Sequence, residues 1–192
     1  MLARAALLAL AALSAIPAVT SAATPPGGFR PFAPDSVWNL PLRFDAPIDP
    51  QSSSYVAWLN QSIATNGTWI NTTTCGMPIF WADPGTPTVK VTLDPSAYQD
   101  PALIRAWSAV PMPPEAKPAN CGDKNFAVLQ AQPDGSIREW EFWSATKAAD
   151  GSWTARWGGA TSNVNTDRGI ASSLGWFDAS APIGGPRLAA IG

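Results

Sequence analysis

The stretch IREWEFWSA, which begins at Ile137, limits the possible folds of this chain more than any other segment. Its bulky side chains alternate along the sequence, and in a β-strand successive side chains point to opposite faces of the sheet. Glu139, Glu141 and Trp143 therefore share one face. Trp140 and the residues two positions before and after it share the other face. Because both faces carry large side chains, the stretch predicts a central strand that is covered on both sides.

The segments on either side of this stretch predict strands that pair with it. Residues 126–132 form a strand-like run, and the Pro-Asp-Gly sequence at 133–135 has the residue types of a tight turn. Downstream, an Asp-Gly pair at 150–151 leads into residues 152–157, in which tryptophans alternate with polar residues. Together these segments predict a three-stranded antiparallel meander.

The remaining patterns predict further strands and two helices. One helix is expected between Pro50 and Gly67, with a serine cap, and a shorter surface helix is expected over 101–110. The helix expected between Pro50 and Gly67 has an apolar stripe at helical spacing, formed by Val56, Leu59 and Ile63. Further strands are expected over 69–73, 77–82 and 88–93, and a polar loop over 158–175.

Short strands, frequent turn residues and two-sided sheet faces together indicate the fold class. We expect an all-β fold, a mainly antiparallel β-sandwich of the jelly-roll type, with one or two short peripheral helices. Two-sided faces require a second layer, because an apolar face must be buried against another element.

The N-terminal sequence predicts export. Arg4 precedes an apolar run and then small residues, so residues 1–23 are expected to be a secretory signal peptide. The run is shorter than the roughly 20 residues of a membrane span, and no such span is expected. Residues 24–34 are expected to be a Pro/Gly-rich lead-in, and residues 35–192 a single β-rich domain. The apolar run at 188–192 indicates either a last strand or a truncated C-terminus.

The cysteine and histidine counts exclude several kinds of chemistry. The chain has two cysteines, Cys75 and Cys121, and export would place them where a disulfide persists. A disulfide between them is therefore expected. The chain has no histidine, which removes Ser-His-Asp and Cys-His catalysis as these are ordinarily built. With two cysteines and no histidine, a zinc site is not expected. Two sets of side chains offer oxygens for a calcium ion, but neither matches a defined calcium loop, so no metal site and no cofactor are predicted; the sets are Asp123 with Asn125, and Asp167 with Asn163 and Asn165.

The balance of charge argues against nucleic-acid binding. The chain has 12 basic and 14 acidic residues, a net charge of -2, and no run of Lys or Arg. A surface that binds nucleic acid electrostatically is therefore not expected. The chain has ten tryptophans, and part of them must be core residues. Tryptophan also presents a large amphipathic face that can stack on a sugar ring.

Glu139 and Glu141 form the candidate catalytic pair. Two residues apart on one strand face, their Cα atoms are about 6.6–6.8 Å apart. Glycosidases hold two carboxyl groups about 5–5.5 Å apart when retaining and about 6.5–9.5 Å apart when inverting, so the spacing permits either. Trp143 and Trp153 are candidate sugar platforms. Further candidate contacts to a glycan are Arg156 and Asn163. The alternative is that both carboxylates face water and pair with arginines, Arg156 or Arg105.

Four segments carry a resemblance to a known group of proteins. The chain is similar to secreted actinobacterial proteins of unassigned activity that share a Trp-Glu-Phe-Trp core strand. The segments are FAPDSVWN at 32–39, WINTT at 69–73, WEFWSA at 140–145 and WGG at 157–159. The resemblance implies a secreted β-rich domain and supplies no reaction. Within it, Glu141 matches a motif position and Glu139 does not.

Two functions from different classes are therefore expected from the sequence. The first is a secreted, extracellular, non-catalytic module that binds a polysaccharide or a cell-wall glycan. The alternative is a carbohydrate-active enzyme, a glycoside hydrolase or polysaccharide lyase, that uses the carboxylate pair on the central strand.

Overall fold

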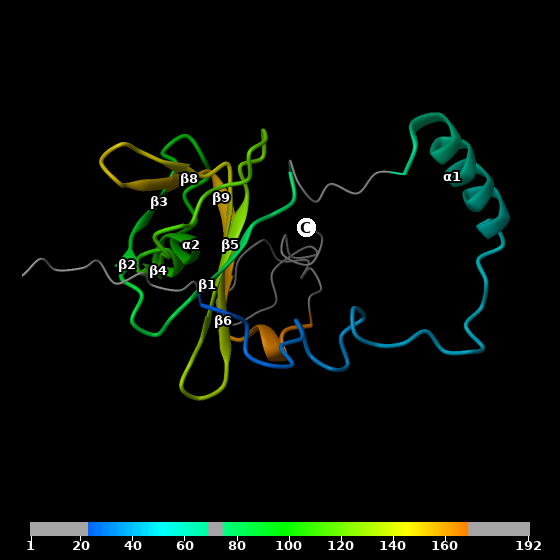
Figure 1. Ribbon diagram of the computed structural model, residues 1–192, viewed down its shortest axis with the longest axis horizontal. Coiled ribbons are helices and arrows are strands. Elements are labelled where there is room, and N and C mark those ends of the chain that lie inside the picture. The colour runs from blue at the N-terminus through cyan, green and yellow to red at the C-terminus, as the bar shows by residue number, and fades with distance from the viewer. Residues whose placement is uncertain (1–22, 69–74, 169–192) are drawn as a thin grey trace, which may run out of the picture.

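The computed structural model describes residues 23–68 and 75–168 (Figure 1). The predicted signal peptide, the strand predicted over 69–73 and the apolar run at 188–192 lie outside these residues. The described part of the chain is mainly β, with two α-helices and one short 3₁₀ helix. The elements are α1 (Ser52–Asn66), β1 (Ile79–Ala82), β2 (Thr88–Val89), β3 (Val91–Leu93), α2 (Pro101–Ala106), β4 (Val110–Pro111), β5 (Phe126–Ala131), β6 (Ile137–Trp143), β7 (Thr146–Lys147), β8 (Trp153–Ala155), β9 (Trp157–Thr161) and η1 (Val164–Thr166).

A four-stranded sheet with the order β1-β5-β6-β9 forms the centre of the molecule (Figure 1). The predicted hairpin of β5 and β6 is confirmed, with Val128 opposite Trp140. Gly135 closes its turn with a φ of 83°, a left-handed conformation that glycine adopts without steric cost. Strand β1 pairs with β5 in parallel, and β9 pairs with β6 antiparallel. The central strand of the sequence prediction is therefore paired on both edges.

The third strand of the predicted meander is present, but its predicted pairing with the central strand is wrong. Residues 153–155 form β8, which pairs in parallel with β3 and antiparallel with β7 in a separate sheet. The edge of β6 pairs instead with β9, in the segment predicted as a polar loop. The chain leaves the first sheet at Ser144, whose φ is 53°. The β7–β8 hairpin places Trp153 in the main core, on the side that faces the first sheet. Strand β8 therefore belongs to the second layer and does not lie beside β6.

The main core lies between one face of the four-stranded sheet and a second layer. Trp140 and Phe142 extend from β6 into this core, and Leu103 and Trp107 enter it from α2 and the residue after it. All four side chains are almost completely buried. Helix α2 was expected at the surface with one apolar side, and in the structure Leu103 is buried while Ile104 and Arg105 are exposed. Asp100 caps its N-terminus by accepting hydrogen bonds from the N–H groups of Ala102 and Leu103.

Gly158 permits the close approach of β9, β6 and Trp107. A Cβ atom built at Gly158 would contact the carbonyl oxygen of Glu141 and lie 2.7 Å from Cζ2 of Trp107. Both neighbours belong to the packed centre of the molecule. No residue larger than glycine fits here without displacing the sheet or the tryptophan.

The opposite face of the sheet carries a smaller apolar cluster. Its buried members are Met77, Ala127, Leu129, Ile137 and Val164, and Phe29 and Trp81 pack against it. The lead-in contributes to this side, because the N–H of Phe32 donates to the carbonyl of Val164. Glu139 and Glu141 also point to this face.

Helix α1 was predicted at the correct position but with the wrong environment. None of its residues is buried, and the stripe of Val56, Leu59 and Ile63 is exposed. Figure 1 shows α1 standing apart from the strands. The expected serine cap is also wrong: Gln51 is the N-cap and makes no side-chain cap bond. The single strand predicted over 88–93 is divided into β2 and β3 at Lys90.

The predicted disulfide between Cys75 and Cys121 is confirmed. It joins two positions 46 residues apart in sequence, just before the parallel strands β1 and β5. In the chain-entropy model, closing a loop of this length stabilises the fold by about 3–4 kcal/mol. The bridge therefore fixes the starts of two strands that no short turn connects.

Three turns use the same local device, an aspartate followed two residues later by a serine. Asp94, Asp134 and Asp150 each accept two hydrogen bonds through Oδ1, one from the backbone N–H of that serine and one from its hydroxyl. These bonds lower the pKa of each aspartate below its ordinary value of 3.8. The turns are therefore held by ionised carboxylates at neutral pH.

Candidate functional site

The two candidate catalytic carboxylates are buried. The exposed fraction is 2% for Glu139 and 3% for Glu141, so the expectation that they face water is wrong. Both make polar or electrostatic interactions. An ionised carboxylate is costly to bury unless it is paired. The burial of Glu139 and Glu141 therefore indicates a structural role.

The neighbours of the two carboxylates differ in size. Across the sheet, Glu139 lies between Leu129 of β5 and Thr161 of β9, whereas Glu141 lies between Ala127 and Gly159. Directly opposite residues share a face of the sheet, so the two cross-strand neighbours of Glu141 on this face are both small. The sequence alternation predicted this shared face but gave no sign of how deeply it is covered.

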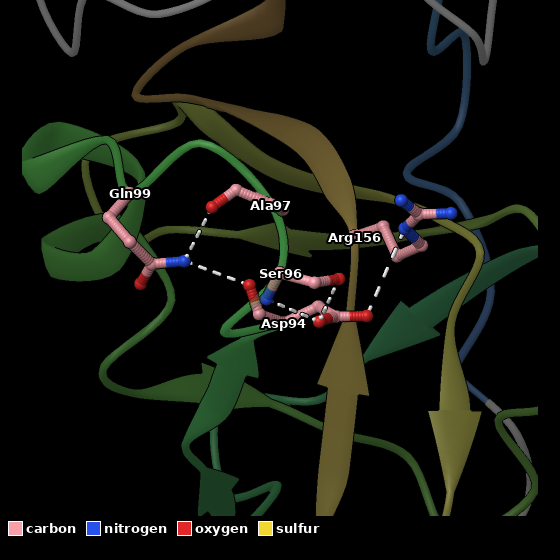
Figure 2. Close-up of polar contacts among 5 residues, drawn as sticks. All are labelled: Asp94, Ser96, Ala97, Gln99 and Arg156. Carbon is pink, nitrogen blue, oxygen red and sulfur yellow. Dashed lines mark hydrogen bonds and ion pairs between the residues drawn. The ribbon is translucent and has the colours of Figure 1, made fainter.

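Arg156 does not pair with the carboxylates of β6. Its Nε lies 3.9 Å from Oδ2 of Asp94, at the end of β3, and Figure 2 shows this pair together with Ser96 and Gln99. The hydrogen bonds from Ser96, with the charge of Arg156 as a smaller contribution, lower the pKa of Asp94. The Gln99 amide donates to the carbonyl of Asp94. Arg156 therefore secures a turn.

Two other candidate contact residues also have structural roles. Trp153 is 2% exposed and its ring lies 5.3 Å from that of Phe126, inside the main core, so no sugar can stack on it. Asn163 accepts hydrogen bonds from the N–H groups of Ile137 and Asn165 and thereby caps η1. The alternation that suggested a platform at Trp153 arises from packing in a second layer.

Trp143 is the candidate platform that solvent can reach. It is 38% exposed at the end of β6, and its indole Nε1 donates to Oδ1 of Asp123 at 3.2 Å. Across the sheet it is opposite Trp157, whose ring lies 6.2 Å from the exposed ring of Tyr98. Trp143 is thus an exposed aromatic side chain with a fixed orientation.

The loop that holds Trp143 is fixed from several directions. Ser144 donates its N–H to the carbonyl of Asp123 at 2.7 Å, and Ala145 donates to Lys124 at 3.1 Å. Lys124 and Ser144 have φ values of 44° and 53°, which cost non-glycine residues roughly 1–3 kcal/mol each. The disulfide at Cys121 anchors the beginning of the loop. This segment is therefore rigid and locally strained, as binding sites often are.

Several residues at this end of the molecule were not predicted to be functional. They are the lysines Lys117, Lys124 and Lys147, which line one surface hollow. Oδ1 of Asn125 is also here, buried and without a hydrogen-bond partner. The lysines are widely spaced in the sequence, so the one available signal was their position on either side of Cys121 and after the Trp143 strand.

In residues 23–68 and 75–168, no three His, Cys, Asp or Glu side chains are grouped so that they could hold a metal ion. No helix in the same part of the chain is long and apolar enough to cross a membrane. Comparison of the chain with protein-family models, with curated proteins and with solved structures finds no match.

Proposed function

We propose that this protein is a secreted, non-catalytic module that binds carbohydrate through Trp143. The observation that carries the proposal is that Trp143 is exposed while its indole N–H is held by Asp123. A sugar presents an apolar C–H face to an aromatic ring, and a ring that is already oriented loses little conformational entropy when the sugar binds. The packing of the four-stranded sheet on a second layer supports a β-sandwich as the scaffold of this site.

The position of the carboxylates favours binding over hydrolysis. A general acid or base must come within hydrogen-bond distance of the substrate, and Glu139 and Glu141 are 2% and 3% exposed. Trp143, on the same strand, is the residue of this face that reaches the surface. The burial of the pair therefore supports a structural role for the carboxylates beneath a binding surface.

A pull-down on a panel of insoluble polysaccharides tests the proposal. The wild-type protein should be retained on at least one polysaccharide, and Trp143→Ala should lose that retention. Trp58→Ala is the matched control, because Trp58 is 65% exposed on α1, away from the strands. Both variants should melt within a few degrees of the wild type, since each side chain is exposed.

The result that overturns the proposal is equally specific. If folded Trp143→Ala is retained as well as the wild type on every polysaccharide, Trp143 is not a binding residue. If reducing sugar accumulates with the wild type and not with Glu141→Gln, the protein is a hydrolase, and the proposal of a non-catalytic module is wrong.

A further inference from the structure

A surface hollow of about 630 Å³ lies beside the loop that holds Trp143. The residues of the disulfide region form one side of it, and the chain that follows β6 forms another. Its lining residues are Gly76, Pro78, Lys117, Pro118, Ala119, Asn120, Lys124, Ala145, Thr146 and Lys147. The hollow is therefore built by segments that the Cys75–Cys121 bridge and the β5–β6 hairpin bring together.

The charge of this hollow is opposite to that of the whole chain. The sequence contains four lysines, and three of them, Lys117, Lys124 and Lys147, line the hollow. No aspartate or glutamate lines it. In the described part of the chain, the ion pairs involve arginines and leave these three ammonium groups without a carboxylate partner. A chain with a net charge of -2 thus gathers three of its four lysines in one place.

The hollow is continuous with the Trp143 platform along the backbone. Asp123 holds the indole of Trp143, and the next residue, Lys124, lines the hollow. On the other segment, Ala145 lies two residues after Trp143 and donates its N–H to the carbonyl of Lys124. The ammonium of Lys147 lies 5.4 Å from the ring centre of Trp153, which fixes one cation at the rim.

We propose that the hollow binds the carboxylates of an acidic polysaccharide, a chain of uronic acid units, whose neighbouring sugar ring stacks on Trp143. This inference rests on the proposed function and names the class of its ligand. The lysines would neutralise successive carboxylates, and the aromatic ring would supply the contact that a simple polyanion lacks. Uronate chains have about one charge per sugar, a density that a few separated lysines can match.

The experiment measures the affinity of the oxidised protein for soluble polygalacturonate by calorimetry. The wild type should bind at low salt and much more weakly at about 1 M salt, where the screening length is about 3 Å. The triple variant Lys117→Gln/Lys124→Gln/Lys147→Gln should bind at least tenfold more weakly, because each exposed ion pair contributes a factor of up to about five. Lys90→Gln is the matched control and should bind like the wild type, since Lys90 lies between β2 and β3 and outside the hollow.

Two further probes separate this inference from the proposed function. Polyglutamate has the carboxylates without the sugar, and a neutral glucan has the sugar without the carboxylates. Polygalacturonate should bind more tightly than either. Equal binding of polyglutamate and polygalacturonate would show that the hollow is a general anion site and would overturn the assignment to uronates.

The variants also distinguish which of the two ideas fails. If Trp143→Ala abolishes binding and the triple lysine variant binds as the wild type does, the carbohydrate site stands and the lysine hollow is excluded. If the lysine variant weakens binding and Trp143→Ala does not, the hollow stands and the aromatic platform is excluded. Absence of polygalacturonate binding by the wild type would overturn the inference directly.

Discussion

Replacing Gly158 with alanine should destabilise the protein more than its size suggests. The added Cβ would contact the carbonyl oxygen of Glu141 and would lie 2.7 Å from Cζ2 of Trp107 and 2.8 Å from the carbonyl carbon of Glu141. Ordinary van der Waals contact begins near 3.4 Å, so the indole would have to move by about 0.7 Å in a close-packed core. The backbone of β6 cannot move as easily, because it is paired on both edges.

The expected cost follows from these contacts. Overpacking a core costs about 1–3 kcal/mol in typical cases and sometimes more, and here one of the two obstacles is backbone. We expect a loss of about 3 kcal/mol in the free energy of unfolding, which in a protein of this size lowers Tm by about 6–12 °C. Urea unfolding followed by tryptophan fluorescence measures it. Gly85→Ala is the control, because nothing lies within 4 Å of a Cβ at Gly85.

A double variant tells the two contacts apart. Trp107→Phe removes the atom that a Cβ at position 158 would meet, so it should recover part of the loss if the indole is the main obstacle. If the carbonyl of Glu141 is the main obstacle, Trp107→Phe should add its own cavity cost and recover nothing. A Gly158→Ala variant within about 0.5 kcal/mol of the wild type would refute the close packing of β6 and β9 described above.

Glu141→Gln should lower the free energy of unfolding by about 1–3 kcal/mol, as expected when a buried, partnered group is altered; unchanged urea unfolding would remove Glu141 from a structural role. Stability should fall as pH drops below about 3.8, because Asp94 and Asp134 have lowered pKa values in the folded state. Each ionised carboxylate therefore contributes stability above its unfolded pKa, and this contribution is lost on protonation. Asp94→Asn should make the fall of Tm at acid pH shallower, and an identical fall would contradict a stabilising role for the ionised Asp94. Alkylation of the oxidised protein should find no free thiol at Cys75 or Cys121, and reduction should cost about 3–4 kcal/mol; equal urea midpoints before and after reduction would contradict that stabilising role.

Local patterns predicted the parts of the fold that depend on neighbouring residues. The β5–β6 hairpin follows from alternation and from the turn at 133–135, and both helices begin within two residues of their expected starts. The pairing of β8 could not be predicted in this way, because it joins β3 in parallel across a long connection. The segment around Trp153 alternates as a strand of the first sheet would, but its position in the second layer depends on the packing of Trp153 against Phe126.

The candidate site was predicted less completely, for a related reason. Alternation correctly places Glu139 and Glu141 on one face, but the depth at which a face is covered depends on segments remote in sequence. The hollow depends on such distances too: Lys117 and Lys147 are thirty residues apart and meet because the chain reverses at β5–β6 and is anchored at Cys121. No single-sequence pattern carries that information.

The covalent ring closed by Cys75 and Cys121 also determines how the molecule carries mechanical tension. A force applied at the two ends of the chain passes through the sulfur atoms, so residues 76–120, which lie between the two cysteines, bear none of it. That sheltered segment contains β1, β2, β3, α2 and β4. Strands β5, β6 and β9 lie outside the ring and take the load. In a single-molecule pulling experiment, reduction should lengthen the fully extended chain by about 160 Å, the reach of the released segment.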